Sequence, residues 1–326
     1  MKKKTNIGLI GAGYWGMNLI RNFNNLGVLK IVSDTNKKKK DEVLKISPTI
    51  KFSLDYKDIL NDKSITAVVI STPPLSHYKL TYEALLSGKH VFVEKPLCLE
   101  LKKGKKLVGL AKKSNLKIMI GHLMLYHPAF IKMKEKIKSG LIGNIRYIYS
   151  NRLSLGKLRK EEDVLWSFAP HDISMILNLV KTPLLNIEAF GGSYLTKKIK
   201  DTTLTMLTFK KNIKAHIFVS WLNPYKDQRL IVIGDKGMIV FADTEKDKNK
   251  LLFYDHDVRW EGAVPIISKS KGKTITFNYK KEPLFIECKS FIDWIEKKIK
   301  PPSVGEEGLR VLSVLELAKK KLGRII

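Results

Sequence analysis

Cysteine, arginine and long apolar runs are all scarce in this 326-residue chain, and each absence excludes a class of protein. Cys98 and Cys288 are the only cysteines, which is too few for a disulfide framework, and they lack the spacing of a zinc site. This usage fits the reducing cytoplasm. No stretch approaches the roughly 20 apolar residues that a membrane-spanning helix needs, so we expect no membrane partner.

Basic charge is plentiful, but it comes almost entirely from lysine. The formal net charge is +29, and only 8 of the 60 basic residues are arginine. The lysines are scattered along the chain, whereas nucleic-acid binders concentrate their charge and interleave it with arginine and aromatic residues. We therefore predict no nucleic-acid partner and interpret most of the charge as a solvated surface, which can still attract an anionic substrate.

A glycine-rich turn follows the first apolar run of the chain. The run Asn6 to Ile10 predicts a buried strand, a helical pattern begins after the turn, and the turn itself consists of Gly11, Ala12, Gly13, Tyr14, Trp15 and Gly16. G-x-G-x-x-G between a strand and a helix is typical of dinucleotide binding. Gly11 permits the tight turn, Gly13 lets the backbone approach a pyrophosphate, and Gly16 allows close packing of the helix. The alternative is a glycine-rich turn without a ligand.

An acidic residue ends the second predicted strand, Val28 to Ser33. Asp34 lies 18 residues beyond Gly16. A carboxylate there can accept both hydroxyls of an adenine ribose and would repel a 2′-phosphate, so we predict NAD rather than NADP. The lysines at positions 37 to 40 could neutralise such a phosphate, but we interpret them as a solvated helix start.

The stretch from 89 to 97 is predicted to carry the chemistry. The apolar run Val91 to Val93 predicts a strand, and Pro96 cannot donate to a sheet, so the strand should end near Glu94 and Lys95. Ligands of open parallel sheets bind outside the carboxyl ends of the strands, which would place Lys95 at the ligand crevice. The alternative is a surface lysine after an edge strand.

A proline-containing segment follows the third predicted strand, Ile65 to Ile70. Thr72, Pro73 and Pro74 should form a stiff loop where the nicotinamide half of the cofactor would lie, with a helix from about Tyr78 to Ser87 after it.

Taken together, these motifs resemble the Gfo/Idh/MocA family of oxidoreductases, and similar segments at 282–284 and 301–315 extend the resemblance to nearly the whole chain. The resemblance implies an α/β fold: a Rossmann doubly wound parallel sheet over residues 1–123, then a substrate-binding α/β domain over residues 124–326 with a large, mostly antiparallel sheet. It implies assembly into homodimers or homotetramers through that sheet. It also implies a set of cofactor-binding residues: Gly11, Gly13, Tyr14, Trp15, Gly16, Asp34, Thr72, Pro73, His77, Glu94 and Lys95.

His171 is the predicted catalytic partner of Lys95. Pro170 suits the first turn of a helix, so His171 would stand at a helix start, where the macrodipole keeps an imidazole neutral and able to accept a proton. A structural histidine would look the same in sequence. In the family an Asp-x-x-x-His pattern acts with the lysine of Glu-Lys-Pro, and Ser167 stands here where that aspartate is usual. Asp172 should project differently and is not a substitute for it.

Basic side chains gather just before the His171 segment, at Arg152, Lys157, Arg159 and Lys160. Guanidinium groups suit phosphate or carboxylate oxygens, although a solvated basic loop balanced by acidic neighbours is the alternative. Segments 151–159 and 166–172 resemble the family branch of surface-polysaccharide and amino-sugar pathways. The predicted substrate is therefore a nucleotide sugar, such as UDP-N-acetylglucosamine or its uronic acid, oxidised at carbon 3 to a ketone that an aminotransferase could use. The predicted substrate contacts are Tyr126, Arg152, Arg159, Ser167 and Asp172, with packing as the alternative for Tyr126.

Two other functions stay open: an inositol or free-sugar dehydrogenase of the same family, and a non-catalytic regulator that binds a dinucleotide and a sugar. No metal is predicted, because no histidine pair shares a helix face.

The remaining apolar runs predict strands at 145–153, 186–194, 203–209, 214–221, 229–233, 238–241 and 251–254, and helices at 129–138, 285–299 and 307–322, with a hairpin turn at 234–237.

Overall fold

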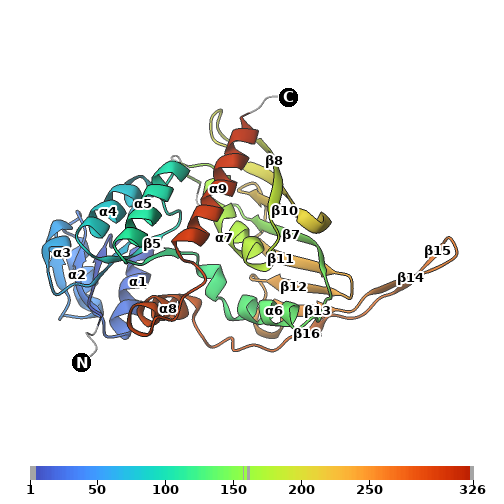
Figure 1. The fold of residues 1–326 in the computed structure, drawn as a ribbon, viewed down its shortest axis with the longest axis horizontal. Helices are drawn as coiled ribbons and strands as arrows, with labels where there is room; N and C mark the ends of the chain where they lie inside the picture. The colour runs from blue at the N-terminus through green and yellow to red at the C-terminus, as the bar shows by residue number, and fades with distance from the viewer. Residues whose placement is uncertain (1–4, 157, 160–161, 324–326) are drawn as a thin grey trace. The chain divides into compact units, whose positions relative to one another are not determined.

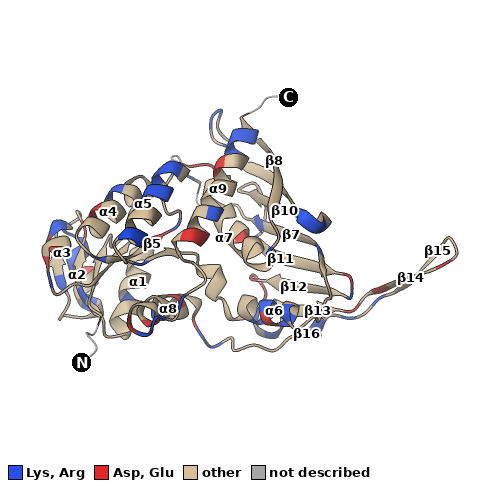
Figure 2. Cartoon of the chain, viewed as in Figure 1, with Lys and Arg blue, Asp and Glu red and all other residues tan. Residues whose placement is uncertain are grey.

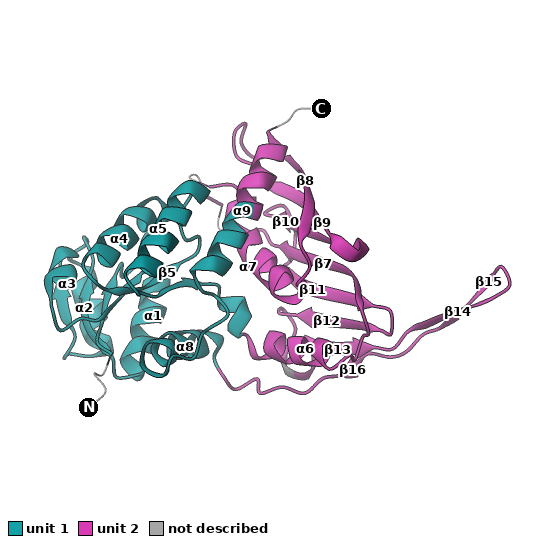
Figure 3. Ribbon diagram, in the orientation of Figure 1, with its two compact units in different colours: residues 1–126, 282–313 teal, residues 127–281, 314–326 magenta. Residues whose placement is uncertain are grey.

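The computed structural model describes residues 5–156, 158–159 and 162–323 (Figure 1). The chain folds as two compact units (Figure 3). Unit 1 comprises Met1–Tyr126 and Glu282–Ser313, and unit 2 comprises His127–Lys281 and Val314–Ile326. The sequence predicts contiguous domains with a boundary after residue 123, whereas in the structure residues 282–313 return to the first unit.

Unit 1 is built on a parallel sheet, six-stranded over the described residues, in the order β3-β2-β1-β4-β5-β6. The strands are β1 (Ile7–Ile10), β2 (Leu29–Ser33), β3 (Lys51–Ser53), β4 (Ala67–Ile70), β5 (His90–Glu94) and β6 (Ile118–Gly121). This is the predicted doubly wound Rossmann order, and it reverses between β1 and β4, the place where such sheets bind ligands. β1, β4 and β6 are buried throughout, as expected for parallel strands covered on both faces.

The helices of unit 1 are α1 (Tyr14–Asn25), α2 (Lys39–Ile46), α3 (Lys57–Asn61), α4 (Pro74–Leu86), α5 (Leu101–Lys113) and α8 (Pro283–Lys297), with a 3₁₀ turn η1 at Leu123–Tyr126. Three aromatic rings explain why α8 belongs here. Phe92 on β5 packs edge-on against Phe23 on α1 and Phe291 on α8, with ring centroids 6.0 and 5.8 Å away. The core of unit 1 thus includes a segment nearly 200 residues downstream.

The helix after β4 corrects one prediction. α4 begins at Pro74 rather than near Tyr78, and Pro73 is its N-cap residue. The two prolines therefore open a helix instead of stiffening a loop. Pro74 is suited to this place because the amide hydrogens of the first helical turn have no partner within the helix.

Unit 2 is built on a mixed sheet, eight-stranded over the described residues, in the order β16-β13-β12-β11-β7-β10-β9-β8. Only β7 and β10 pair in parallel; the other neighbours are antiparallel, as predicted. The strands are β7 (Ile145–Leu153), β8 (Leu184–Gly192), β9 (Thr202–Phe209), β10 (Lys214–Ser220), β11 (Asp227–Gly234), β12 (Met238–Ala242), β13 (Leu251–Tyr254) and β16 (Lys273–Thr274). The hairpin turn at 234–237 joins β11 to β12. Gly237 in this turn has a φ of +149°, a value that favours glycine.

Helices α6 (Pro128–Lys138) and α7 (Val164–Leu179) and the 3₁₀ turns η2 (Lys210–Asn212) and η3 (Asp247–Lys250) complete unit 2, and α7 lies against β7, β9 and β10. The last helix, α9 (Gly305–Leu322), begins in unit 1 and ends in unit 2. A separate two-stranded hairpin, β14 (Asp257–Glu261) and β15 (Val264–Ser268), extends from the β13 and β16 edge of the sheet (Figure 1). No strand was predicted from the sequence at either position of this hairpin.

Across the described ranges, no helix is both long and apolar enough to cross a membrane. The same ranges contain no group of three or more histidine, cysteine or acidic side chains arranged to hold a metal ion.

Candidate functional site

The glycine turn after β1 leaves open space at the amino terminus of α1. Gly11 has a φ of +100°, and a Cβ on Gly16 would lie 2.0 Å from the Gly11 carbonyl oxygen, so both positions require glycine. Gly13 differs, because a Cβ there would meet no atom within 4 Å. The first turn of α1 carries no acidic residue. The free amides and the macrodipole of this helix end therefore fit a pyrophosphate.

Asp34 joins the end of β2 to this turn. Its Oδ2 accepts a hydrogen bond from the Ala12 amide at 2.6 Å, and its Oδ1 accepts one from the Asn36 amide at 2.8 Å. Each carboxylate oxygen can accept a further hydrogen bond. The carboxylate that the sequence assigns to the ribose hydroxyls is thus held beside the glycine turn by the backbone.

His77 connects two loops at the carboxyl edge of the sheet. The side chain is 1% exposed, with Nδ1 2.7 Å from the Pro96 carbonyl oxygen and Nε2 2.8 Å from the Thr72 carbonyl oxygen. Burial lowers the pKa of His77. Both ring nitrogens contact protein backbone, so His77 holds the loop after β4 against the loop after β5, which is a positioning role in the predicted cofactor site.

Trp15 and Glu94 link the glycine turn to the strand that carries Lys95. The Trp15 indole N–H donates to Glu94 Oε1 at 2.6 Å, and the Lys95 amide donates to Glu94 Oε2 at 3.3 Å. A Cβ on Gly121 would lie 2.8 Å from the Glu94 carboxyl group, so the glycine in β6 makes room for this carboxyl group. Although Glu94 is only half-buried, desolvation raises its pKa to about 7, against the lowering effects of Trp15 and Lys95. Glu94 therefore binds a proton more readily than an exposed glutamate does.

The neighbouring interior of unit 1 is unusually polar, which our sequence analysis did not predict. His122 Nδ1 lies 2.6 Å from Glu307 Oε2. Glu287 is fully buried, its carboxyl oxygens have no hydrogen-bond partner among the described residues, and burial together with the Glu94 charge raises its pKa well above the ordinary range. Only contacts between distant segments create this cluster, so no local signal in the sequence could have found it.

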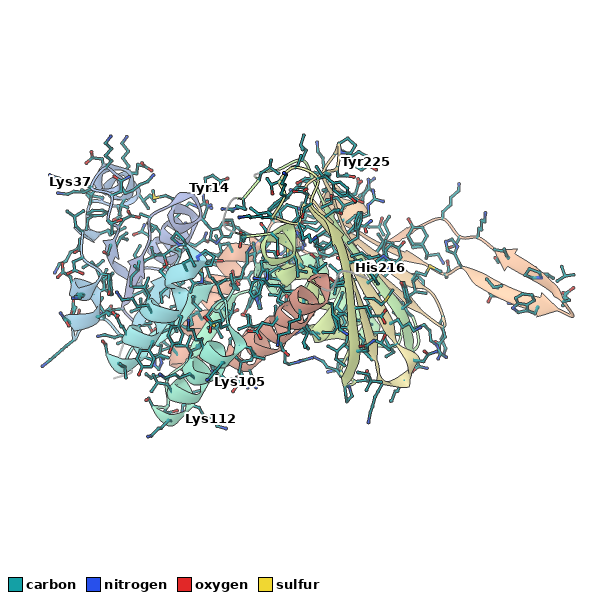
Figure 4. The ribbon with its side chains drawn as sticks, turned by 90° about the horizontal axis from the view of Figure 1, so that it is seen from above. Tyr14, Lys37, Lys105, Lys112, His216 and Tyr225 are labelled. Carbon is teal, nitrogen blue, oxygen red and sulfur yellow. The ribbon has the colours of Figure 1, made fainter. Side chains whose placement is uncertain are left out.

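Tyr126, a predicted substrate contact, lies in this polar interior. It is 2% exposed, and its hydroxyl is 2.7 Å from the Ser303 hydroxyl. The structure favours the packing alternative for this residue. Tyr14, in contrast, is 81% exposed and points outward near the start of α1 (Figure 4).

The helix that carries His171 begins earlier than the sequence suggests. α7 starts at Val164, and the Asp163 carboxylate caps it by accepting a hydrogen bond from the Trp166 amide at 3.0 Å. Pro170 lies inside the helix, so the prediction that His171 stands at a helix start is wrong, and the macrodipole argument does not apply to it. The cap and the apolar packing of the first two turns outweigh the hydrogen bond that Pro170 removes. Ser167 and His171 are four residues apart and share one helix face.

Arg152 and Asp172, both predicted to contact substrate, bind each other. Arg152 Nε donates to Asp172 Oδ2 at 2.7 Å and Nη2 to Oδ1 at 3.3 Å, and Ser150 donates to Oδ1 at 2.6 Å. The two charged residues are 7% and 1% exposed. This buried pair fastens α7 to β7 next to His171 and uses the guanidinium group that was expected to capture an anion.

The rest of the predicted basic cluster is only partly described. Arg159 is exposed and lies 3.7 Å from Glu162, while Lys157 and Lys160 lie outside the described residues. The structure therefore does not bring Arg152 and Arg159 together on one surface.

The predicted site residues are divided between the two units. In unit 1, the carboxyl ends of β1, β2, β4 and β5 bring together the glycine turn, Asp34, the Thr72–Pro73 loop and Glu94–Lys95 at one edge of the parallel sheet. In unit 2, α7 supplies Ser167 and the half-buried His171. Unit 1 thus offers a helix end that suits an anion, a carboxylate and an ammonium group, and unit 2 offers a hydroxyl and an imidazole.

Comparison with known proteins gives two family matches and several relatives. Residues 5–122 match the GFO_IDH_MocA oxidoreductase family with an NAD-binding Rossmann fold, and residues 130–240 match the GFO/IDH/MocA C-terminal domain. Inositol 2-dehydrogenase/D-chiro-inositol 3-dehydrogenase of Lactiplantibacillus plantarum is 27% identical over 80% of each chain. UDP-N-acetylglucosamine 3-dehydrogenase of Acidithiobacillus ferrooxidans is 25% identical over 94% of this chain and 93% of that one.

A solved structure of UDP-N-acetylglucosamine 3-dehydrogenase from Acidithiobacillus ferrooxidans superposes with a TM-score of 0.84 at 22% identity, covering 98% of each chain. At this identity the superposition supports the fold of both units.

Proposed function

Since the chain belongs to the Gfo/Idh/MocA family of oxidoreductases with an NAD-binding Rossmann domain, we propose that it oxidises a secondary alcohol of a nucleotide sugar. The first candidate is the C3 hydroxyl of UDP-N-acetylglucosamine or its uronic acid. The observation that carries this choice is the relative with that activity, which aligns over 94% of this chain. The product would be a 3-keto sugar suited to an aminotransferase, and the protein would assemble as a homodimer or homotetramer.

The cofactor part of the proposal rests on unit 1. The open helix end at Gly13 suits the pyrophosphate, and the Asp34 carboxylate beside the glycine turn suits a ribose with two free hydroxyls. Tyr14, Trp15, Thr72, Pro73 and Glu94 complete the proposed cofactor set, with His77 positioning the Thr72 loop. When bound, NAD accepts the hydride that leaves the substrate carbon.

The catalytic part of the proposal assigns one role to each unit. Lys95, at the carboxyl end of β5, orients and polarises the substrate oxygen. His171 on α7 accepts the hydroxyl proton as that oxygen becomes a carbonyl. Ser167 stands one helical turn before His171 and can hydrogen-bond substrate or imidazole, but it cannot supply the charge of the aspartate that the family usually has there.

The nucleotide part of the substrate has the least support from the site. The positive charge of the chain favours encounter with a diphosphate, and Arg159 is exposed to receive one. Arg152, however, is committed to Asp172. One expected phosphate ligand is therefore lost. Because an inositol dehydrogenase is also 27% identical to this chain, oxidation of an uncharged polyol is the second candidate.

The test is NADH formation, followed by absorbance, in purified protein given NAD and one substrate at a time. UDP-N-acetylglucosamine and its uronic acid are compared with myo-inositol, glucose and glucose 6-phosphate. Turnover that clearly favours the UDP-sugars supports the proposal, and a preference for myo-inositol or glucose replaces it with the second candidate. Tight NAD binding without turnover of any compound would instead indicate a regulator that binds a dinucleotide.

A further inference from the structure

The β14–β15 hairpin, residues 257–268, has no core of its own. All ten strand residues are exposed, and within the described part of the chain its strands pair only with each other. An isolated two-stranded hairpin is marginally stable at best in water. A hairpin of this kind gains its stability when one of its faces packs on another surface.

The register of the hairpin divides its residues between an apolar and a mixed face. Val258 pairs with Ile267 and Trp260 with Pro265, and residues directly opposite each other share a face, so these four apolar side chains lie together. Val258, Trp260 and Ile267 are 53%, 66% and 59% exposed.

The mixed face holds the pairs Asp257–Ser268, Arg259–Ile266 and Glu261–Val264. Arg259 Nε donates to Asp257 Oδ2 at 2.6 Å, an ion pair between exposed side chains on this face. One face of the hairpin is therefore suited to water and the other to a protein surface.

The apolar face of the hairpin continues a row of side chains from the unit 2 sheet. Leu252 and Tyr254 on β13 pair with Val240 and Met238 on β12. The rings of Tyr254 and His256 then contact each other in a tilted arrangement with centroids 5.4 Å apart, and Val258 and Trp260 follow at the same alternate spacing. Whatever covers this side of the sheet edge is therefore positioned to cover the hairpin as well.

That side of the sheet, which we call the open face, is opposite α7. Even-numbered β7 residues such as Ser150 and Arg152 bind Asp172 on α7, so the odd-numbered ones point to the open face. Tyr149 stacks there on His216 of β10, with ring centroids 5.4 Å apart. Figure 4 shows His216 on this sheet. By register, the open face also includes Phe190, Leu204, Met206, Phe218, Tyr147, Ile231, Ile233, Met238 and Val240.

Lysine is nearly absent from the open face. In a chain with 52 lysines, Lys214 is the only one that the register of the described strands places there. Figure 2 shows the corresponding contrast, with blue concentrated on helices and loops and the sheet strands mostly tan. The register also places Glu188, Asp227 and Arg229 on this face, so its two basic and two acidic side chains balance. A surface of aromatic and aliphatic residues with few charged ones is typical of the centre of a protein interface. For a partner that is itself strongly basic, such a surface also avoids repulsion between like charges.

We propose that the β14–β15 hairpin is an arm that packs its Val258, Trp260, Pro265 and Ile267 face onto a second copy of this chain, as an extension of an interface between open faces. A second copy carries the same lysine-poor apolar surface and, in a two-fold dimer, a second arm that makes the same contact in return. The inference rests only on the homo-oligomer part of the proposed function and is independent of the reaction.

Two neighbouring isoleucines provide a matched test of the arm. Ile267→Asp places a carboxylate on the apolar face, and Ile266→Asp places the same group on the mixed face of the same strand. We expect Ile267→Asp to weaken self-association at least about 10-fold in sedimentation velocity, because it would bury a charge, whereas Ile266→Asp should associate like the unmodified chain. Circular dichroism melting confirms that both variants are folded, and NAD binding should be unchanged in both.

The possible outcomes distinguish a failure of the proposed arm from a failure of the proposed oligomer. A chain that is monomeric without any substitution overturns both the arm and the proposed oligomer. An oligomer that both variants preserve overturns the arm alone, as does an equal loss of association in the two variants.

Cross-linking locates the surface that receives the arm. Cys98 and Cys288 are both buried, so a Trp260→Cys chain presents a new exposed thiol for a photoreactive maleimide. Heavy-isotope and light-isotope chains are mixed, labelled, illuminated and digested. Cross-links that join a light arm peptide to heavy peptides of β7, β10 or β11 support the proposal. Cross-links confined to a single chain, or to unit 1 peptides, would overturn it.

Discussion

The two sheets of this protein place their candidate functional residues by different means. In unit 1 the parallel strands are covered on both faces, and the candidate residues of the glycine turn, Asp34 and Lys95 lie at the strand ends. In unit 2 the strand ends carry no comparable cluster of predicted residues. There a helix packed on one face supplies Ser167 and His171, and a buried ion pair fixes that helix. A site made at strand ends follows from local sequence, whereas one made by a docked helix depends on tertiary packing.

The largest expected effect is a loss of turnover without a matching loss of NAD affinity. Lys95→Ala and His171→Ala should each lower kcat about 10²–10⁴-fold, because each removes a positioned group that acts on the substrate hydroxyl. NAD affinity should stay nearly unchanged in the His171 variant, since the cofactor residues lie in unit 1. Initial rates and calorimetric titration with NAD measure the two quantities, with Lys103→Ala on the surface of α5 as the control. Near-normal turnover in either variant would refute the assignment of that residue.

The next effect concerns what holds α7 in place. Arg152→Ala leaves Asp172 buried without its partner and should cost about 3–5 kcal/mol of unfolding free energy. Arg146→Ala on the same strand removes an exposed ion pair and should leave the free energy of unfolding nearly unchanged. Denaturant unfolding compares the two. If Arg152→Ala is as stable as Arg146→Ala and instead loses only substrate affinity, Arg152 is a substrate ligand as the sequence first suggested.

A smaller effect tests the cofactor carboxylate. Asp34→Ser removes the charge that repels a 2′-phosphate and an acceptor for the ribose hydroxyls, so the ratio of NAD to NADP affinity should fall about 10-fold or more. Fluorescence titration with each cofactor provides the ratio. Serine retains a short acceptor for the Ala12 amide, which limits damage to the turn. Equal affinities for NAD and NADP in the unmodified chain would contradict the role of Asp34.

The smallest effect is a pH dependence of stability in unit 1. Glu94 has a pKa of about 7 in the folded chain, above its ordinary value of 4.5. Between these two values the folded chain binds a proton that the unfolded chain has released, so the stability due to Glu94 is complete below about pH 4.5 and is lost as the pH rises to about 7. Thermal melts of Glu94→Gln, which cannot ionise, should fall less steeply over this window than those of the unmodified chain. Parallel curves would show that Glu94 ionises normally.

Prediction from sequence succeeded where a single residue type enforces a local geometry. Gly11 and Gly16 are required by a tight turn and a close approach, Pro96 ends the strand before Lys95, and apolar runs mark the strands of the unit 1 sheet. These features depend on neighbours within a few positions, so the fold class and the geometry of the glycine turn could be predicted.

Prediction from sequence failed where a contact between residues far apart in the chain determines the local structure. The start of α7 depends on the Asp163 cap and on packing that lets Pro170 lie inside a helix. The Arg152–Asp172 pair joins a strand to a helix 20 residues away, and His122 meets Glu307 across 185 positions. No pattern within a short window reports such partners. The β14–β15 hairpin was missed because its apolar face is exposed, so burial does not set its pattern.

The return of α8 to unit 1 has a consequence for synthesis of the chain. A ribosome delivers the strands of the unit 2 sheet before it delivers Phe291, so the nascent Rossmann sheet must wait, with the Phe92 side of β5 uncovered, until some 200 further residues have emerged. Unit 2 is thus placed to fold as an insertion inside an unfinished neighbour. During that interval the Phe92 ring lacks the edge-on contact with Phe291 that completes the core of unit 1.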